Sequence, residues 1–242
     1  MSRHARHVAL AQVGNAGQQR IGDARILIVG VGGIGCAAAS YLASSGVGQL
    51  DLNDFDTVDE TNLGRQILFG PGDVGKGKAN TAAARLATRN PDIRISVLDE
   101  RLDASAMSAA VADADIVLDG SDNFATRYLV NDACVGAKRC LVSGSAIRLE
   151  GQLAVFGPDY TTSPCYRCLY EDADESLENC AGNGVLSPVP GVIGTLMAVE
   201  ALKQIVGLDS PRGKLQLYDA GDGSFRSVSI AKRVECLSCQ RG

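Results

Sequence analysis

The chain has 242 residues, of which 45% are hydrophobic and 21% charged, and its 23 basic and 28 acidic residues give a net charge of −5. A chain of this length can bury a core without disulfide bonds, and its negative charge argues against a broad nucleic-acid surface. The only two histidines, His4 and His7, lie at the start of the chain, so neither a Ser-His-Asp triad nor a His-ligated catalytic zinc is expected inside the fold.

Strands and helices alternate through the first half of the sequence. Residues 25–29 form a short, continuous apolar run that ends in glycines, which is typical of a buried parallel strand. The further strands are expected at 49–53, 93–98 and 115–119, and the helices between them at 36–44, 78–89, 104–112 and 125–137. This alternation predicts a Rossmann-like, doubly wound α/β sheet.

The second half has a different pattern. Strands are expected at 141–145 and 151–156, followed by an irregular segment, an apolar helix at 192–206 and a hairpin at 214–218 and 225–230. The sheet is therefore expected to be mixed, with a parallel first half and antiparallel strands in the second. We expect a single domain over 1–242, divided into an N-terminal arm (1–24), a nucleotide-binding half (25–140) and a second half (141–242) with a flexible loop at 157–190.

Neither a membrane span nor a secretory signal is expected. No apolar run approaches about 20 residues, and residues 1–12 have neither an apolar core nor a small-residue cleavage site. We expect a soluble, cytoplasmic protein. In that compartment, the eight cysteines of the chain are more often metal ligands or catalytic groups than disulfide partners.

A glycine-rich loop follows the first predicted strand. Gly30, Gly32 and Gly35 match the G-x-G-x-x-G pattern between a strand and a helix, where a helix N-terminus can bind phosphate. Asp54 follows the second strand, where it can accept a hydrogen bond from a ribose hydroxyl. Taken alone, this loop favours an NAD-dependent oxidoreductase.

Further polar residues favour ATP over a dinucleotide. Arg65 lies in the polar stretch 61–66, Lys78 lies at the next helix start, and Asp122 and Asn123 follow the fourth strand. Basic side chains can bind the negative charges of a triphosphate, and a carboxylate at this edge of the sheet can hold Mg²⁺. The alternative for each charge is a solvated surface position.

Two C-x-x-C pairs, Cys165 with Cys168 and Cys236 with Cys239, form a set of four soft ligands. They indicate a closed, structural zinc site with four cysteine ligands, and a redox role is the alternative. Cys36, Cys134 and Cys140 are expected to be buried and passive. Cys180, in a polar segment, is either a nucleophile or a passive thiol.

The whole set of motifs resembles the ThiF/MoeB/HesA family, the bacterial relatives of ubiquitin-activating enzymes. The resemblance spans nearly the whole chain. The motifs that carry it are the glycine loop, Asp54-Phe55-Asp56, Asn62-Leu63-x-Arg65-Gln66, Lys78, Asp122-Asn123, Gly151-Gln152 and both C-x-x-C pairs. Residues 144–152 are more similar to the molybdopterin-synthase adenylyltransferase (MoeB) type than to the thiamine-pathway (ThiF) type.

This resemblance implies adenylation of the C-terminal Gly-Gly of a ubiquitin-like sulfur carrier protein, for thiocarboxylate formation in molybdenum cofactor biosynthesis. It implies a homodimer, in which Arg6 of one subunit reaches the phosphates of the other, and a sulfur-transfer role for Cys180 in the ThiF branch. The chain ends at Gly242 without a rhodanese domain, so the sulfur donor is expected to be a separate protein. The residues expected around ATP are Gly30, Gly32, Gly33, Gly35, Asp54, Asp56, Thr61, Asn62, Arg65, Gln66, Lys78, Asp122 and Asn123.

The expected chemistry agrees with a site without histidine, because a carrier carboxylate is already ionised at neutral pH. Asp122 is assigned to Mg²⁺, and Arg6, Arg65 and Lys78 are assigned to phosphate charge. An NAD-dependent oxidoreductase and a non-catalytic binding scaffold remain as alternatives. The sequence leaves open which carrier is bound.

Overall fold

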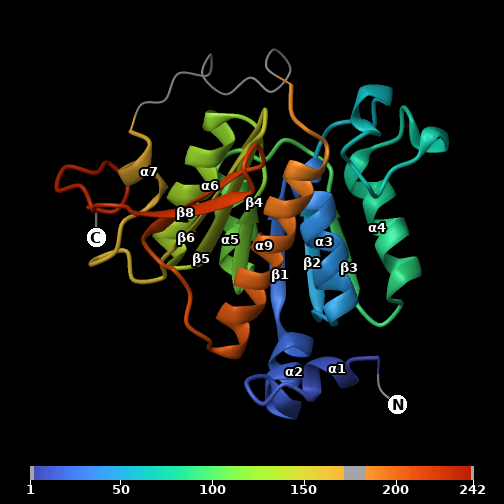
Figure 1. The fold of residues 1–242 in the computed structure, drawn as a ribbon, viewed down its shortest axis with the longest axis horizontal. Helices are drawn as coiled ribbons and strands as arrows, with labels where there is room; N and C mark the ends of the chain where they lie inside the picture. Colours follow the sequence, from blue (N-terminus) through green and yellow to red (C-terminus); the bar gives the residue numbers. More distant parts are fainter. Residues whose placement is uncertain (1–2, 172–183, 241–242) are drawn as a thin grey trace.

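The computed structural model describes residues 3–171 and 184–240. One eight-stranded sheet runs through these residues in the order β3-β2-β1-β4-β5-β6-β7-β8 (Figure 1). The five strands that pair in parallel are β1 (Arg25–Val29), β2 (Gln49–Asn53), β3 (Arg94–Leu98), β4 (Ile116–Asp119) and β5 (Cys140–Ile147). The antiparallel strands are β6 (Glu150–Phe156), β7 (Lys214–Asp219) and β8 (Ser224–Ser229). The predicted mixed, Rossmann-like sheet is confirmed.

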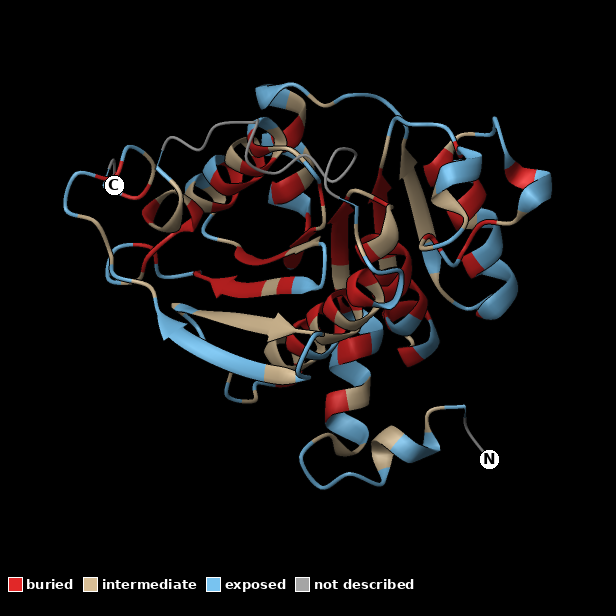
Figure 2. Ribbon diagram, turned by 45° about the horizontal axis from the view of Figure 1, so that its top comes forward, coloured by how far each residue is buried: buried red, intermediate tan, exposed pale blue. Residues whose placement is uncertain are grey.

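Helices cover both faces of this sheet and enclose two hydrophobic cores. On one face lie α3 (Gly33–Ser45), α4 (Lys78–Arg89) and α9 (Pro188–Val206), and on the other lie α5 (Ala104–Asp113) and α6 (Phe124–Ala137). Figure 2 shows the central strands buried between these layers, whereas β8 forms an exposed edge. The continuous apolar runs of β1 and β4 are explained by this burial on both faces.

Helix α9 is the one helix among the described residues that is long and apolar enough, by composition, to cross a membrane. It packs against α3, β5 and β6, as a core helix does. It begins at Pro188, four residues before the predicted start, because proline is accepted in the first turn of a helix. It ends at Gly207, which has the left-handed conformation (φ 79°) expected of a C-terminal cap.

In the residues that it describes, the structure adds three α-helices that the sequence pattern did not predict. Helices α1 (Ala5–Val8) and α2 (Gly14–Asp23) lie within the expected N-terminal arm, and α7 (Tyr166–Leu169) lies within the expected irregular segment 157–190. Helix α2 contains few apolar residues, and only Gly17 and Ile21 are buried. Tertiary contacts stabilise it instead: the Arg20 guanidinium donates to the carbonyl of Val206 at the end of α9 (2.8 Å).

Candidate functional site

A pocket of about 370 Å³ opens at the carboxyl ends of the parallel strands. It lies where the chain order of the strands reverses, because β1 is flanked by β2 on one side and β4 on the other. Doubly wound sheets bind ligands at this switch point. Of the thirteen residues expected around ATP, eleven line this pocket, namely Gly30, Gly32, Gly33, Asp54, Asp56, Asn62, Arg65, Gln66, Lys78, Asp122 and Asn123.

The glycine loop brings backbone atoms into close contact with one another. Gly30 has φ +83°, and a Cβ placed there would lie 3.0 Å from the backbone of Gly120 and Ser121. A Cβ on Gly35 would lie 2.0 Å from the carbonyl oxygen of Gly30. Gly35 therefore supports the loop from below, which explains why it does not line the pocket.

Asp54 holds the same loop from the side. Its Oδ2 accepts a hydrogen bond from the Val31 amide (2.8 Å) and its Oδ1 accepts one from the Asp56 amide (2.9 Å). Burial raises the pKa of the Asp54 carboxyl, and the charge of Lys78 and these hydrogen bonds oppose the shift. Each carboxylate oxygen retains a second lone pair, so Asp54 can still accept a hydrogen bond from a ribose hydroxyl.

The cations of the pocket are held by local contacts. The Lys78 ammonium is 2.9 Å from Asp56 Oδ2, and the lysine is only 7% exposed. Arg65 Nη1 donates to the Thr61 carbonyl (2.9 Å) across the 3-10 turn Glu60–Asn62. The Thr61 hydroxyl donates to Asp59 (2.6 Å) and does not line the pocket.

Gln66 carries an unsatisfied polar atom. It is 3% exposed and lines the pocket, and its Oε1 has no hydrogen-bond partner among the residues that the structure describes. A buried polar atom without a partner is costly. A donor from a ligand bound in the pocket would satisfy this oxygen.

The loop between β4 and α6 presents a carboxylate to the pocket. Asp122 is exposed, whereas the side-chain oxygen of Asn123 caps α6 by accepting from the Thr126 amide (2.8 Å). Mg²⁺ is commonly bound through one or two protein carboxylates together with substrate phosphates. The exposed Asp122 carboxylate fits that requirement better than Asn123, whose side-chain oxygen is already engaged.

Arg127 and Gln152 are among the lining residues that were not assigned to the site from the sequence. Arg127 lies one turn inside α6 and is 4% exposed, and Gln152 lies on β6. The spacing of Arg127 from Asn123 places both on one face of α6. The sequence could have indicated Arg127, because it lies on the face of a helix that starts at the ligand-binding edge of the sheet.

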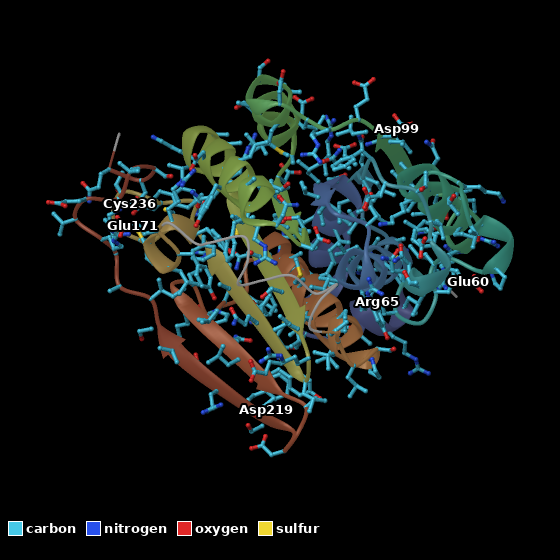
Figure 3. The ribbon with its side chains drawn as sticks, turned by 90° about the horizontal axis from the view of Figure 1, so that it is seen from above. Glu60, Arg65, Asp99, Glu171, Asp219 and Cys236 are labelled. Atoms are coloured by element: carbon cyan, nitrogen blue, oxygen red, sulfur yellow. The ribbon has the colours of Figure 1, made fainter. Side chains whose placement is uncertain are left out.

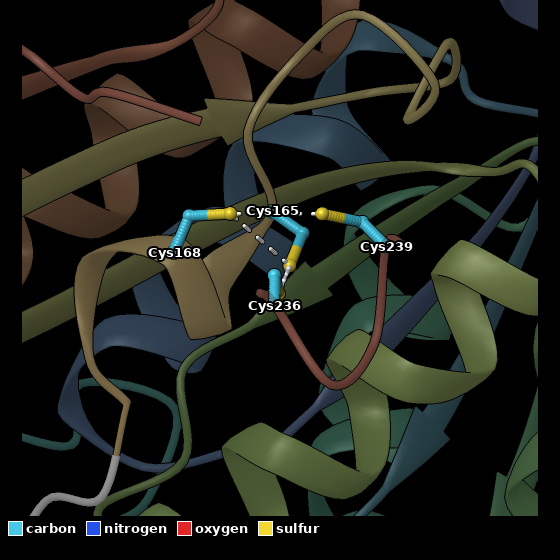
Figure 4. Close-up of side chains that lie close together, drawn as sticks. All are labelled: Cys165, Cys168, Cys236 and Cys239. Atoms are coloured by element: carbon cyan, nitrogen blue, oxygen red, sulfur yellow. Dashed lines mark hydrogen bonds between the residues drawn. The ribbon is translucent and has the colours of Figure 1, made fainter. Parts of the chain in front are cut away.

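The four predicted zinc ligands come together on the other side of the molecule from Arg65, as the positions of Arg65 and Cys236 in Figure 3 show. The sulfur atoms of Cys165, Cys168, Cys236 and Cys239 all lie within 4.8 Å of one another (Figure 4). Three of the sulfur–sulfur distances are 4.0, 3.5 and 3.6 Å. A tetrahedral zinc with Zn–S bonds of about 2.3 Å requires edges of about 3.8 Å, so the four-cysteine cluster fits this ion.

Donors surround the four-cysteine cluster as thiolates require. The Lys232 ammonium is 3.1 Å from Cys239 Sγ, and the Arg233 amide donates to Cys168 Sγ (3.5 Å). The sulfur separations are far longer than the bond of about 2.0 Å in a disulfide. A closed set of four ligands favours a structural metal site over the redox alternative.

Cys36, Cys134, Cys140 and Arg6 do not line the pocket. Cys36, Cys134 and Cys140 are buried free thiols, and burial raises the pKa of Cys36 and of Cys140 to about 12. Cys180 lies outside the described residues. Arg6 is exposed on α1, beyond the start of β1, and so lies at the opposite end of the parallel strands from the pocket of its own chain.

Comparisons with known proteins find similar sequences and similar structures. The model of the ThiF family matches residues 4–238. The molybdopterin-synthase adenylyltransferase of Escherichia coli (strain K12) is 44% identical over 240 residues, which cover 99% of this chain and 96% of that protein. The sulfur carrier protein ThiS adenylyltransferase of the same strain is 43% identical over 237 residues, or 98% and 94% of the two chains. The structure of Escherichia coli MccB with ATP has a TM-score of 0.84 at 26% identity, covering 98% of this chain and 73% of that one.

Proposed function

Since the chain belongs to the ThiF family, we propose that it is an adenylyltransferase that transfers AMP from ATP to the C-terminal Gly-Gly carboxylate of a ubiquitin-like sulfur carrier protein. The observation that carries the proposal is the pocket at the switch point of the sheet, where the glycine loop, Arg65, Lys78 and Asp122 meet. The matched relatives are named as adenylyltransferases, which argues against an NAD-dependent oxidoreductase. The retained cations and carboxylate argue against a non-catalytic scaffold.

The reaction uses positioning and charge rather than a base. The carrier carboxylate is ionised at neutral pH, and the described lining of the pocket contains no histidine. Asp54 binds the ribose, while Arg65 and Lys78 stabilise the phosphate charge and the departing pyrophosphate. The Asp122 carboxylate would hold Mg²⁺, which would supply positive charge against the phosphates.

We further propose a homodimer in which Arg6 of the partner subunit completes each pocket. The position of Arg6, at the far end of the strands from its own pocket, supports an action across the dimer. The four-cysteine cluster binds one Zn²⁺, as its sulfur geometry supports. We place the reaction in the cytoplasm and assign sulfur donation to a separate protein.

The carrier that we favour is the small subunit of molybdopterin synthase, because residues 144–152 are more similar to the MoeB type. The two Escherichia coli relatives, of the molybdopterin and ThiS kinds, are 44% and 43% identical to this chain, so overall similarity does not separate them. The thiamine-pathway carrier is the second candidate. Cys180 is dispensable for adenylation in either case, since that step needs only the phosphate site. Cys180→Ala is expected to retain full pyrophosphate exchange.

The test is carrier-dependent exchange of pyrophosphate into ATP, measured with each carrier in turn. Wild-type protein is expected to catalyse exchange with one carrier and to produce no exchange with a carrier that lacks its C-terminal Gly-Gly. Asp122→Asn is expected to lower the rate by about 100-fold or more, because the site loses the charge that holds Mg²⁺. Asp92→Asn, at an exposed turn before β3, is the matched control. Near-normal exchange by Asp122→Asn would show that the metal is held elsewhere.

A further inference from the structure

Helix α7 connects the four-cysteine cluster to helix α6. It begins directly after Cys165 and contains Cys168. The amide of Tyr166 donates to Asn131 Oδ1 (2.8 Å), and its hydroxyl oxygen is 3.2 Å from Arg127 Nη1, which donates to it. Arg127 and Asn131 are four residues apart, so they lie on one face of α6. Tyr166 therefore docks the cluster onto that face with two hydrogen bonds.

Arg127 also contacts the loop that lines the nucleotide pocket. Its Nε and Nη2 both donate to the carbonyl oxygen of Ser121, at 3.2 and 2.9 Å. The buried Asp119 carboxylate accepts from the amide (3.0 Å) and the hydroxyl (2.7 Å) of the same serine. Ser121 is thus held from both sides, and Asp122 follows it directly. Arg127 fixes the segment that presents the Asp122 carboxylate.

A second tyrosine makes a parallel connection. The hydroxyl of Tyr170, the residue directly after α7, donates to Gln152 Oε1 at 2.6 Å. Gln152 on β6 and Arg127 on α6 both line the pocket. Neither tyrosine lines the pocket itself. The short segment 165–170, which includes two of the cluster's cysteines, therefore contacts two pocket-lining side chains through tyrosine hydroxyl groups.

We propose that Tyr166 and Tyr170 are positioning residues, through which the four-cysteine cluster holds Arg127, Gln152 and the segment carrying Asp122 in the arrangement that MgATP binding requires. The proposal rests on the proposed function for the identity of the ligand. It differs from the expectation that the cluster only anchors the end of the chain, because it makes the nucleotide site depend on α7. The hydrogen bond that Arg127 donates to the Tyr166 hydroxyl is charge-assisted, so we expect it to contribute more than the neutral hydrogen bond from Tyr170 to Gln152.

The test compares three Tyr→Phe variants of the zinc-loaded, full-length protein. Tyr166→Phe removes the acceptor for Arg127, and Tyr170→Phe removes the donor for Gln152. Tyr160→Phe is the matched control: Tyr160 is 4% exposed, packs in the same core as the four cysteines, and donates to the carbonyl of Arg139 (2.7 Å) away from the pocket. All three changes delete one hydrogen-bonded hydroxyl, so a purely structural effect would appear in all of them.

The measurements are the dissociation constant of MgATP by calorimetry, the Mg²⁺ concentration that gives half-maximal exchange, zinc content and thermal midpoint. Tyr166→Phe is expected to weaken MgATP binding about tenfold and to raise the half-maximal Mg²⁺ concentration at least about threefold, because Asp122 is less well placed. Tyr170→Phe is expected to weaken MgATP binding about threefold. Zinc content is expected to stay at one per chain in all variants, with thermal midpoints like that of Tyr160→Phe.

Equal MgATP affinity in Tyr166→Phe and Tyr160→Phe would overturn the proposal. It would also be overturned if, in all three variants, the loss of MgATP affinity were proportional to the drop in thermal midpoint. Calorimetry needs no carrier, so it separates this proposal from the proposed function. Wild-type protein that binds MgATP but shows no carrier-dependent exchange would refute the proposed carrier reaction. The order of MgATP affinities among the three variants would still show whether Tyr166 and Tyr170 act as positioning residues.

Discussion

Gly35→Ala tests how closely the glycine loop is packed beneath the nucleotide site. The added Cβ would lie 2.0 Å from the Gly30 carbonyl oxygen, about 1.4 Å closer than the 3.4 Å at which ordinary contact begins. The oxygen belongs to the backbone, so no side chain can rotate to relieve the overlap. Overpacking of this kind costs about 1–3 kcal/mol, and alanine in place of glycine inside a helix returns about 1 kcal/mol. If the clash costs about 3 kcal/mol, we expect Gly35→Ala to lower the free energy of unfolding by about 2 kcal/mol.

The same displacement would move the loop amides that we propose bind the phosphates of ATP. Losing one hydrogen bond to a charged group costs about 1.5–3 kcal/mol, so MgATP affinity is expected to fall by about 10- to 100-fold. Urea unfolding and calorimetry measure the two effects. Gly136→Ala, at an exposed helical position where an added Cβ would meet nothing within 4 Å, is the control and is expected to stabilise by up to about 1 kcal/mol. An unfolding free energy and a nucleotide affinity both equal to wild type in Gly35→Ala would refute the reasoning.

Three further predictions concern the metal, the dimer and pH. Cys168→Ser is expected to lose stoichiometric zinc by elemental analysis and to lower the free energy of unfolding by several kcal/mol, because a structural metal contributes folding energy; full zinc content in this variant would contradict the assigned ligand set. Arg6→Ala and Lys78→Ala chains are each expected to be inactive alone. After random subunit mixing they are expected to recover about a quarter of wild-type exchange, because half of the dimers then contain one intact pocket out of two. No recovery after verified subunit exchange would argue against an action across the dimer. The hydrogen bond from Arg85 lowers the pKa of Asp73 to about 2, so the stability that its carboxylate contributes is present above about pH 4 and is lost as the pH falls towards about 2. Urea unfolding of wild type and Asp73→Asn should therefore differ at neutral pH and converge at low pH, and a constant difference across this range would show that the charge is not the cause.

The strands, the glycine loop and the cysteine pairs could be predicted from the sequence because each has a local pattern. Buried parallel strands are continuous apolar runs, and β1 and β2 begin and end at the predicted residues. The carboxyl ends of parallel strands meet at one edge of a sheet, so Asp54 and Asp122 could be placed in one pocket without knowledge of the packing. Paired C-x-x-C motifs indicate a shared metal regardless of how the chain between them folds.

Only the tertiary structure decided the features that depend on how distant segments pack. Helix α2 has a weak apolar pattern and is held by a contact with the end of α9, 186 positions away. Arg127 and Tyr166 are 39 positions apart, and no periodicity in either segment indicates that they share a hydrogen bond. A sequence pattern encodes which side of an element is buried, whereas a hydrogen bond between side chains depends on the relative placement of two elements to within a few tenths of an ångström. For this reason the sequence determined the fold and most of the candidate nucleotide site. Only the packing of α7 on α6 showed that Tyr166, next to Cys165 of the cluster, is hydrogen-bonded to the pocket-lining Arg127.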